Sequence, residues 1–208
     1  MLKVWGRNTS SNVQKVMWML GELGLPCERI DIGGPFGRNN EPPYLAMNPN
    51  GVVPTLEEDD GFVLWESNSI VRYLAHRYGA GRFEPSDPRV RAKAQSWMDW
   101  QLSVANHAIF PVFWGLIRTP PEKRDPKSIA AGKEKCAAAA SIMDAQLART
   151  RFIADDDISY GDFPIGPFIY RYFRLVPDHP PLPNVERWYA EISARPAFKQ
   201  HVLDVPFT

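Results

Sequence analysis

The sequence is poor in the residues that build metal and redox sites. Its 208 residues include two cysteines, Cys27 and Cys136, and four histidines. No C-x-x-C pair and no H-E-x-x-H pattern occurs, which excludes a dithiol redox motif, a zinc knuckle and a helical metalloprotease site. We therefore expect no metal, and two thiols that are small buried hydrophobic groups in a reducing compartment, the cytoplasm.

An excess of one charge and long apolar runs are also lacking. Lys+Arg and Asp+Glu each number 24, so the formal net charge is zero, which is unlike a protein that binds nucleic acid. No apolar run approaches the roughly 20 residues of a membrane-spanning helix. The first residues also lack the apolar core of a signal peptide. We expect a protein that binds neither nucleic acid nor a membrane.

The first part of the chain alternates between strand and helix patterns. Gly24 ends the first helical pattern, and Asp59-Asp60-Gly61 is a hairpin turn signal. The order β-α-β-loop-β-β-α predicts a thioredoxin-like α/β domain over residues 1–82. Strands are expected at 3–5, 27–32, 52–56 and 62–65, and helices at 13–23 and 70–78.

Only helical patterns follow a linker at residues 83–88. Pro111 should kink or end the first of these helices, because proline removes a backbone donor and its ring meets the preceding turn. We expect an all-helical second domain over residues 88–208. Its helices are expected at 90–114, 129–147, 161–175 and 185–193, with a short one after Pro196.

A proline opens one of the short strands, at Val53-Pro54. Proline donates no hydrogen bond to a sheet, and a trans bond is the usual state, since only about 5–6% of X-Pro bonds are cis. A cis bond would expose the N–H and C=O of Val53, so that an extended peptide could pair with them. The residues alone leave both conformations open.

Two further segments lie where helices are expected to begin. Ser67 could cap a helix, or could bind a carboxylate there while Glu66 pairs with an ammonium group, which suits the amino-acid end of a ligand. In the segment Ser10-Ser11-Asn12, either Ser11 or Asn12 would serve as the cap. The surplus hydroxyls could stabilise a thiolate. A hydrogen bond to a charged group contributes about 1.5–3 kcal/mol, which lowers a thiol pKa by roughly one to two units from about 8.5.

Taken together and in this order, these features resemble those of the cytosolic glutathione transferases, and the resemblance covers nearly the whole chain. The serine-type bacterial members, near the theta and nu classes, are the most similar. Each motif is weak alone, while their joint order and spacing are specific. The motifs are Ser10-Ser11-Asn12-Val13-Gln14-Lys15-Val16, Asn48-Pro49-x-Gly51-x-Val53-Pro54, Glu66-Ser67-Asn68-x-Ile70, the capping box Ser159-Tyr160-Gly161-Asp162, and Arg195-Pro196-Ala197-Phe198.

The resemblance implies how glutathione is held. It implies a cis Val53–Pro54 bond, with Val53 paired to the cysteinyl backbone and with Glu66 and Ser67 on the γ-glutamyl end. The thiolate-stabilising hydroxyl is assigned to Ser10, with Ser11 as the alternative and Asn12 near the sulfur. The His, Gln or Lys that many members place before Val-Pro is absent, so the glycyl end is assigned to Asn50, Arg38 or Asn39.

For the second substrate, the resemblance implies a site between the loop that begins at Arg7 and the proline-containing helix. At least half of its candidate aromatic residues are expected to be core residues. His107 is expected to be an ordinary helix residue rather than a catalyst. The candidate electrophile-site residues are Arg7, Phe110, Phe113, Trp114 and Arg118.

The expected function is a cytoplasmic detoxifying transferase that joins its co-substrate glutathione to a small hydrophobic electrophile. A glutathione-dependent disulfide or peroxide reductase is one alternative. A non-catalytic binding or regulatory protein is another, because a fold does not fix a function. The resemblance also implies a homodimer in which the helix carrying Arg72 and Arg77 faces the partner's helical domain.

Overall fold

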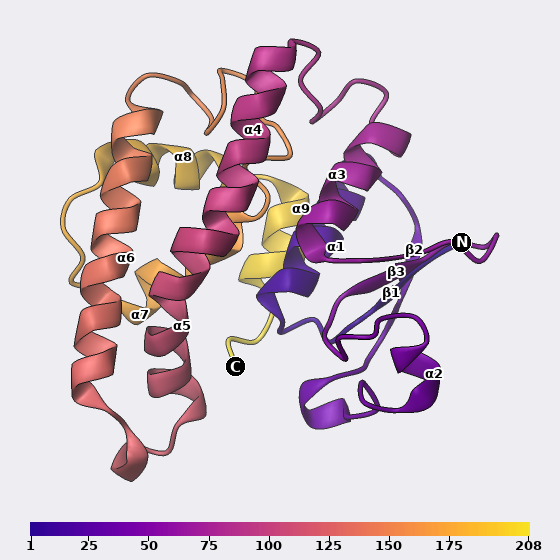
Figure 1. Ribbon diagram of the computed structural model, residues 1–208. Coiled ribbons are helices and arrows are strands. Elements are labelled where there is room, and N and C mark those ends of the chain that lie inside the picture. Colours follow the sequence, from indigo (N-terminus) through magenta and orange to yellow (C-terminus); the bar gives the residue numbers. More distant parts are fainter. The chain divides into compact units, whose positions relative to one another are not determined.

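A computed structural model describes residues 1–208, which form two compact units (Figure 1). One unit comprises Met1–Glu84 with Pro196–Phe207, and the other comprises Pro85–Arg195 with Thr208. The sequence-based division places all of 88–208 in the second domain, whereas the structure groups the C-terminal segment with the first unit. The reason is packing, because the buried ring of Phe198 meets the buried ring of Trp18 edge-on at 4.7 Å between centroids.

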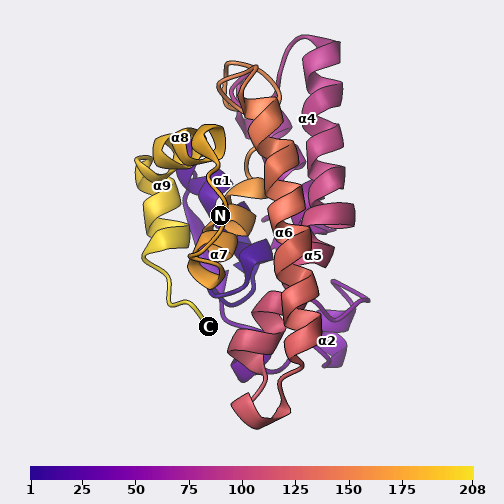
Figure 2. The same cartoon turned by 90° about the vertical axis from the view of Figure 1, so that its left-hand side faces the viewer.

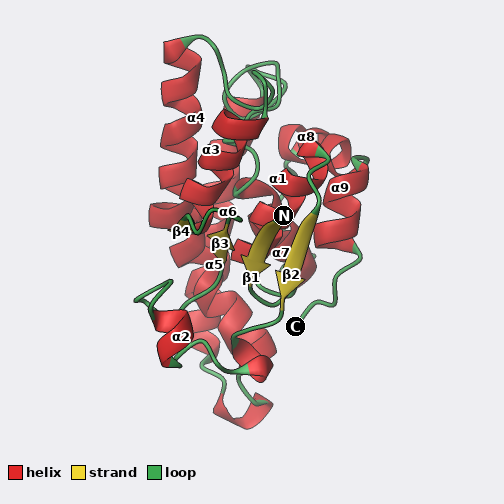
Figure 3. Ribbon diagram, turned by 90° about the vertical axis from the view of Figure 1, so that its right-hand side faces the viewer, coloured by secondary structure: helices red, strands yellow, loops and turns green.

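A four-stranded sheet lies at the centre of the first unit (Figure 3). The strand order is β2-β1-β3-β4, with β1 parallel to β2 and with the other neighbouring pairs antiparallel. This topology confirms the predicted β-α-β and β-β-α halves, although β3 begins three residues later than the pattern indicated. The strands are β1 (Leu2–Trp5), β2 (Cys27–Ile30), β3 (Thr55–Glu57) and β4 (Val63–Trp65).

Two helices of this unit, α1 (Ser11–Leu23) and α3 (Ser67–Tyr78), pack against each other. Gly24 ends α1 as predicted, in the left-handed conformation with φ 69°. The short helix α2 (Pro42–Leu45) was not predicted, because one turn that opens with two prolines carries no apolar periodicity. The terminal turns, α9 (Pro196–Phe198) and the π-helical turn Lys199–Leu203, pack on α1.

The second unit is entirely helical (Figure 2). A π-helical turn at Gln101–Ala105 joins its first two helices, and the chain stays helical from Pro111 through Arg118. Of the two predicted effects of Pro111, a kink or an end of the helix, the end was therefore wrong. The helices are α4 (Pro88–Trp100), α5 (Asn106–Phe113), α6 (Pro126–Leu147), α7 (Ile165–Leu175) and α8 (Pro183–Ser193). None of the chain's helices combines the length and apolar character that crossing a membrane requires.

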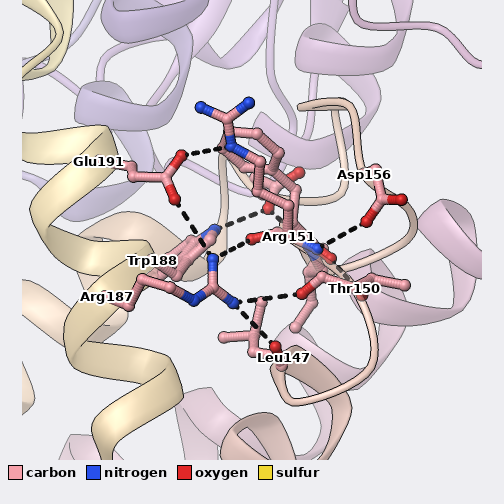
Figure 4. A network of polar contacts seen from close by, with 10 residues as sticks. Leu147, Thr150, Arg151, Asp156, Arg187, Trp188 and Glu191 are labelled. Atoms are coloured by element: carbon pink, nitrogen blue, oxygen red, sulfur yellow. Dashed lines mark hydrogen bonds and ion pairs between the residues drawn. The ribbon is translucent and has the colours of Figure 1, made fainter.

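Arg187 on α8 fastens the segment that follows α6 (Figure 4). Its guanidinium donates to the carbonyl oxygens of Leu147 at 2.8 Å, Thr150 at 3.2 Å and Arg151 at 3.1 Å. It also pairs with Glu191 at 3.2 Å. A cation that donates hydrogen bonds to the orphan carbonyls at a helix C-terminus stabilises that terminus, so this residue joins α6 to α8.

The hydrogen bond from Ser159 N–H to Asp162 that the predicted capping box requires is present, but α7 begins at Ile165 rather than at the predicted residue 161. The Asp162 side chain at its centre is fully buried. Its carboxylate accepts hydrogen bonds from the backbone N–H of Ser159 at 3.0 Å and of Ile153 at 2.9 Å. The indole N–H of Trp188 donates to the same group at 2.9 Å. Burial outweighs these bonds and raises the pKa of Asp162 to about 6.

Candidate functional site

The start of α1 presents a serine hydroxyl that does not cap the helix. Ser10 occupies the N-cap position, with φ −79° and ψ 123°, and its side chain makes no capping hydrogen bond. Its backbone forms the local hydrogen bonds instead: the N–H donates to the Arg7 carbonyl at 3.2 Å, and the carbonyl accepts from Gln14 N–H at 2.9 Å. The expectation that Ser11 or Asn12 would cap the helix was wrong. The Ser10 hydroxyl therefore lies at the positive end of a 13-residue helix and forms no hydrogen bond with the backbone N–H groups there.

The Val53–Pro54 bond is cis, as the resemblance implied. Just before it, the Val52 carbonyl accepts hydrogen bonds from Tyr44 Oη and Asn48 Nδ2, each at 2.7 Å. The N–H and C=O of Val53 have no hydrogen-bond partner in the chain, and β3 begins only at Thr55. This arrangement leaves one backbone donor and one acceptor for an extended ligand.

The start of α3 is unusual in its backbone. Glu66 is the N-cap residue, with φ 70° and ψ 109°, a region that non-glycine residues rarely adopt. Its exposed carboxylate neither caps α3 nor pairs with another side chain. Ser67 is the first helical residue and is buried, and of the two roles that the sequence left open for it, that of N-cap was wrong. Such strain concentrates at functional sites.

A residue that the sequence reasoning passed over lies directly behind Ser67. The side chain of Lys15, on α1, is 1% exposed. Its ammonium group lies 3.5 Å from Ser67 Oγ and 3.2 Å from Asn68 Oδ1. Periodicity could have identified Lys15 as a buried residue. It precedes the buried Trp18 and Met19 by three and four residues and so shares their face of the helix.

The side chains assigned to the glycyl end are occupied with the loop that carries them. Asn39 Nδ2 donates to the Gly51 carbonyl at 2.6 Å, and Asn50 Nδ2 donates to Asn48 Oδ1 at 3.2 Å. Arg38 donates to the Asp31 carbonyl. These bonds close the loop on itself, and the assignment to the glycyl end stays a prediction.

Arg7 packs on two glycines of the segment after β2. A Cβ on Gly34 would come within 2.9 Å of Arg7 Cδ and Nε. A Cβ on Gly33 would lie 3.3 Å from Arg7 Nη1 and 3.2 Å from Val53 Cγ1. Both glycines also have positive φ, at 78° and 60°. The structure thus brings Arg7 beside Val53, against a surface that only glycine can provide.

In the second unit, the candidate electrophile residues separate into two groups. The rings of Phe110 and Trp114 stack at 5.4 Å and are 55% and 52% exposed. They line a cavity of about 290 Å³ together with Pro111 and Ile129. Phe113 is buried, and the Arg171 guanidinium lies 4.1 Å from its ring centroid.

The remaining candidates in this unit are exposed. The side chain of Arg118 is exposed, and it donates to the Thr208 carbonyl at 3.1 Å. His107 is exposed as well, and its Nδ1 lies 3.1 Å from the Leu102 carbonyl within the same helical stretch. The structure thus gives His107 the surroundings of an ordinary helix residue.

Neither cysteine is activated. Burial raises the pKa of the Cys136 thiol to about 12. Burial also raises the pKa of Cys27, against a smaller opposing effect of Arg29. Both thiols are therefore protonated near neutral pH and are poor nucleophiles. No group of three or more His, Cys, Asp or Glu side chains could hold a metal ion.

Comparisons with known proteins cover both units. Residues 5–85 match the family model of the glutathione S-transferase N-terminal domain, and residues 104–196 match that of the C-terminal domain. Glutathione S-transferase GstB of Escherichia coli K12 is 45% identical over 204 residues, which is 98% of both chains. Glutathione S-transferase 3 of Zea mays is 31% identical, over 99% of this chain and 95% of the plant protein.

A solved structure agrees with these matches. The theta class glutathione S-transferase from Xanthomonas axonopodis pv. citri, with glutathione bound, superposes with a TM-score of 0.95 at 41% identity. The match covers 100% of this chain and 99% of that one. The resemblance noted from the motifs, including the similarity to theta-class bacterial members, is therefore confirmed. By its two domain models and its full-length relatives, the chain belongs to the glutathione S-transferase family.

Proposed function

We propose that the first unit binds glutathione and ionises its thiol, and that the thiolate then attacks a small hydrophobic electrophile. The observation that carries this proposal is the Ser10 hydroxyl, which stands at the N-terminus of α1 and makes no capping hydrogen bond. A structural relative at 41% identity is described with glutathione bound.

Glutathione is an extended tripeptide with a free amino-acid group at its γ-glutamyl end. Its cysteinyl backbone pairs with the N–H and C=O of Val53, which have no partner in the chain. The exposed Glu66 carboxylate takes the γ-glutamyl ammonium. Ser67, at the N-terminus of the 12-residue helix α3, takes the α-carboxylate, where the helix dipole favours negative charge.

The chemistry is thiol ionisation followed by substitution. Ser10 donates a hydrogen bond to the sulfur, which favours the thiolate over the thiol and lowers the thiol pKa by roughly one to two units. With a chlorinated nitroarene, the thiolate forms the new C–S bond and chloride leaves with the electron pair. The thiol proton passes to solvent. No side chain forms a covalent bond in this sequence.

The exposed stack of Phe110 and Trp114 provides the electrophile contacts of the second unit. Two stacked rings, inclined at 23° to each other, and the apolar wall of their cavity suit a flat apolar molecule. Phe113 instead belongs to the core, since it is buried under Arg171. Arg118 is a further candidate in this unit, and Arg7 stays a candidate within the first unit.

The test compares two neighbouring serines. Ser10→Ala should remove most turnover of a chlorinated nitrobenzene with glutathione, whereas Ser11→Ala, the matched control, should leave it within about twofold. Ultraviolet difference spectra of the bound thiol across pH should show a lowered thiol pKa in the wild type and in Ser11→Ala only. An equally ionised thiol in Ser10→Ala would refute the role of Ser10. If millimolar glutathione fails to raise the melting temperature, the binding proposal itself fails.

We further propose a cytoplasmic homodimer that detoxifies electrophiles. The proposal follows from family membership and from two cysteines that form no disulfide. Light scattering coupled to gel filtration should give twice the chain mass of 23.6 kDa. A mass of one chain at micromolar concentration would contradict the dimer.

A further inference from the structure

Lys15 places a buried positive charge behind the start of α3. Its side chain is 1% exposed, and its ammonium lies 3.2 Å from Asn68 Oδ1 and 3.5 Å from Ser67 Oγ. Ser67 and Asn68 are themselves 2% and 1% exposed. The contact joins residues 52 and 53 positions apart in the sequence, so it is made by the packing of α1 on α3.

The direction of these hydrogen bonds constrains Ser67. An ammonium group can only donate, so Ser67 Oγ is the acceptor in its contact with Lys15. A serine hydroxyl has one proton, and that proton then remains to be donated to a different group. A hydroxyl that accepts from a cation is also polarised, which makes it a stronger donor. Lys15 therefore prepares Ser67 to donate.

The surroundings favour an anion as the acceptor of that proton. Ser67 is the first residue of α3, where the helix dipole is positive, and Lys15 adds a full charge at the same end. Electrostatic attraction is stronger in a buried setting than in water, because little solvent screens it. A neutral ligand group would gain little from this arrangement, whereas a carboxylate would gain from both charges.

We infer that Lys15 is a positioning residue for glutathione, acting through Ser67 and Asn68 on the α-carboxylate of the γ-glutamyl group. The inference rests on the proposed binding of glutathione at Glu66 and Ser67. Lys15 does not touch the ligand. It orients the Ser67 hydroxyl and raises the positive potential at the α-carboxylate position.

The experiment uses the full-length protein and three substitutions of Lys15. Lys15→Met keeps the length and shape of the side chain but removes the charge, Lys15→Gln keeps a donor without charge, and Lys15→Arg keeps the charge. Lys15→Met should raise the KM for glutathione roughly tenfold, while kcat at saturating glutathione changes less than twofold. The KM of Lys15→Gln should lie between those of the wild type and Lys15→Met. Lys15→Arg should retain most of the affinity for glutathione. Lys135→Met, at an exposed position on α6, is the control for loss of one lysine.

A ligand comparison separates positioning from a merely structural role. Calorimetry should show that Lys15→Met weakens binding of glutathione but not of its α-carboxamide, which lacks the anion. If both ligands weaken equally, or if only the melting temperature falls, Lys15 only stabilises the packing and the inference fails. Failure of both Lys15→Met and Lys15→Gln to fold would also overturn it.

Ser67→Ala distinguishes failure of this inference from failure of the proposed function. If Ser67→Ala does not weaken glutathione binding, the proposed binding of the α-carboxylate at Ser67 is itself wrong. If Ser67→Ala weakens binding and Lys15→Met does not, only the role of Lys15 is wrong. If Lys15 acts through Ser67, the double variant should lose less affinity than the sum of the single variants.

Discussion

The two units begin their helices in different ways. In the second unit, N-cap carboxylates cap two of the helices: Asp87 accepts from Arg89 N–H on α4, and Asp125 accepts from Lys127 N–H and Ser128 N–H on α6. In the first unit, the N-cap side chains of α1 and α3, Ser10 and Glu66, accept no backbone N–H.

The difference has a physical meaning. A capping side chain stabilises a helix by typically about 1 kcal/mol, so the first unit forgoes that stability at two helix starts. An uncapped N-terminus keeps its N–H groups and positive potential for an anion. In the all-helical unit, carboxylates stabilise two helix starts by capping them. In the α/β unit, the proposed function has glutathione bind at the two helix starts that lack a capping side chain.

The largest expected effect is at the buried cap of the second unit. Asp162→Ala would leave the N–H groups of Ile153, Ser159 and Trp188 without an acceptor. Each buried unsatisfied group costs about 1–3 kcal/mol, so urea unfolding should show a loss of about 4 kcal/mol or more. Asp157→Ala, at an exposed position, is the control. A loss below about 1 kcal/mol would contradict the capping role.

The same residue should give the second unit a distinct pH dependence. Burial raises the pKa of Asp162 to about 6, above the roughly 3.9 of an unfolded chain. Between these values the folded state binds more protons than the unfolded state, so the free energy of unfolding falls as pH rises from about 4 to 6. The full change is about 3 kcal/mol. Asp162→Asn should unfold without this dependence, and an identical slope in that variant would assign the effect elsewhere.

A matched pair tests the comparison directly at two helix starts. Asp125→Ala should lower the free energy of unfolding by about 1 kcal/mol, because α6 loses its cap. Ser10→Ala should change the free energy of unfolding by only a few tenths of a kcal/mol, since the hydroxyl caps no backbone N–H. Urea unfolding at pH 7 measures both. Equal losses would show that Ser10 does stabilise α1.

The smallest expected effect has the opposite sign. Glu66→Gly should stabilise the protein by about 0.5–1 kcal/mol, because glycine adopts the φ of 70° without strain. The same variant should bind glutathione more weakly, since the ammonium loses its partner. Glu41→Gly is the control, at an exposed N-cap with an ordinary φ of −84°. Its stability should fall slightly, and stabilisation by both substitutions would remove strain as the explanation.

Much of the architecture could be predicted because it depends on neighbours in sequence. The helix that ends at Gly24 and the hairpin at Asp59-Asp60-Gly61 follow from local turn preferences and periodicity. Asp162 was found in the same way, as part of a local capping box. The helical stretch that contains Pro111 was predicted to end at residue 114, whereas it continues through Arg118.

The candidate site could be predicted in outline only. Its motifs marked the segments at Ser10, Val53 and Glu66, but the N-cap residues of α1 and α3 are Ser10 and Glu66, which precede the capping candidates Ser11, Asn12 and Ser67. Helix boundaries depend on which N–H groups find acceptors, and flanking hydroxyl and carboxylate residues compete for that role. Asn39 and Asn50 looked available in the sequence, and the structure engages both within their own loop.

The sequence by itself determined the order of the elements, the glutathione S-transferase motifs and the local capping box. Periodicity and short-range hydrogen bonding depend on residues that are close together in the sequence. Only the tertiary structure decided that Phe198 returns to α1 and that Lys15 lies behind Ser67. These contacts join distant residues, and they form because an apolar ring and a buried ammonium must each find a partner when water is excluded.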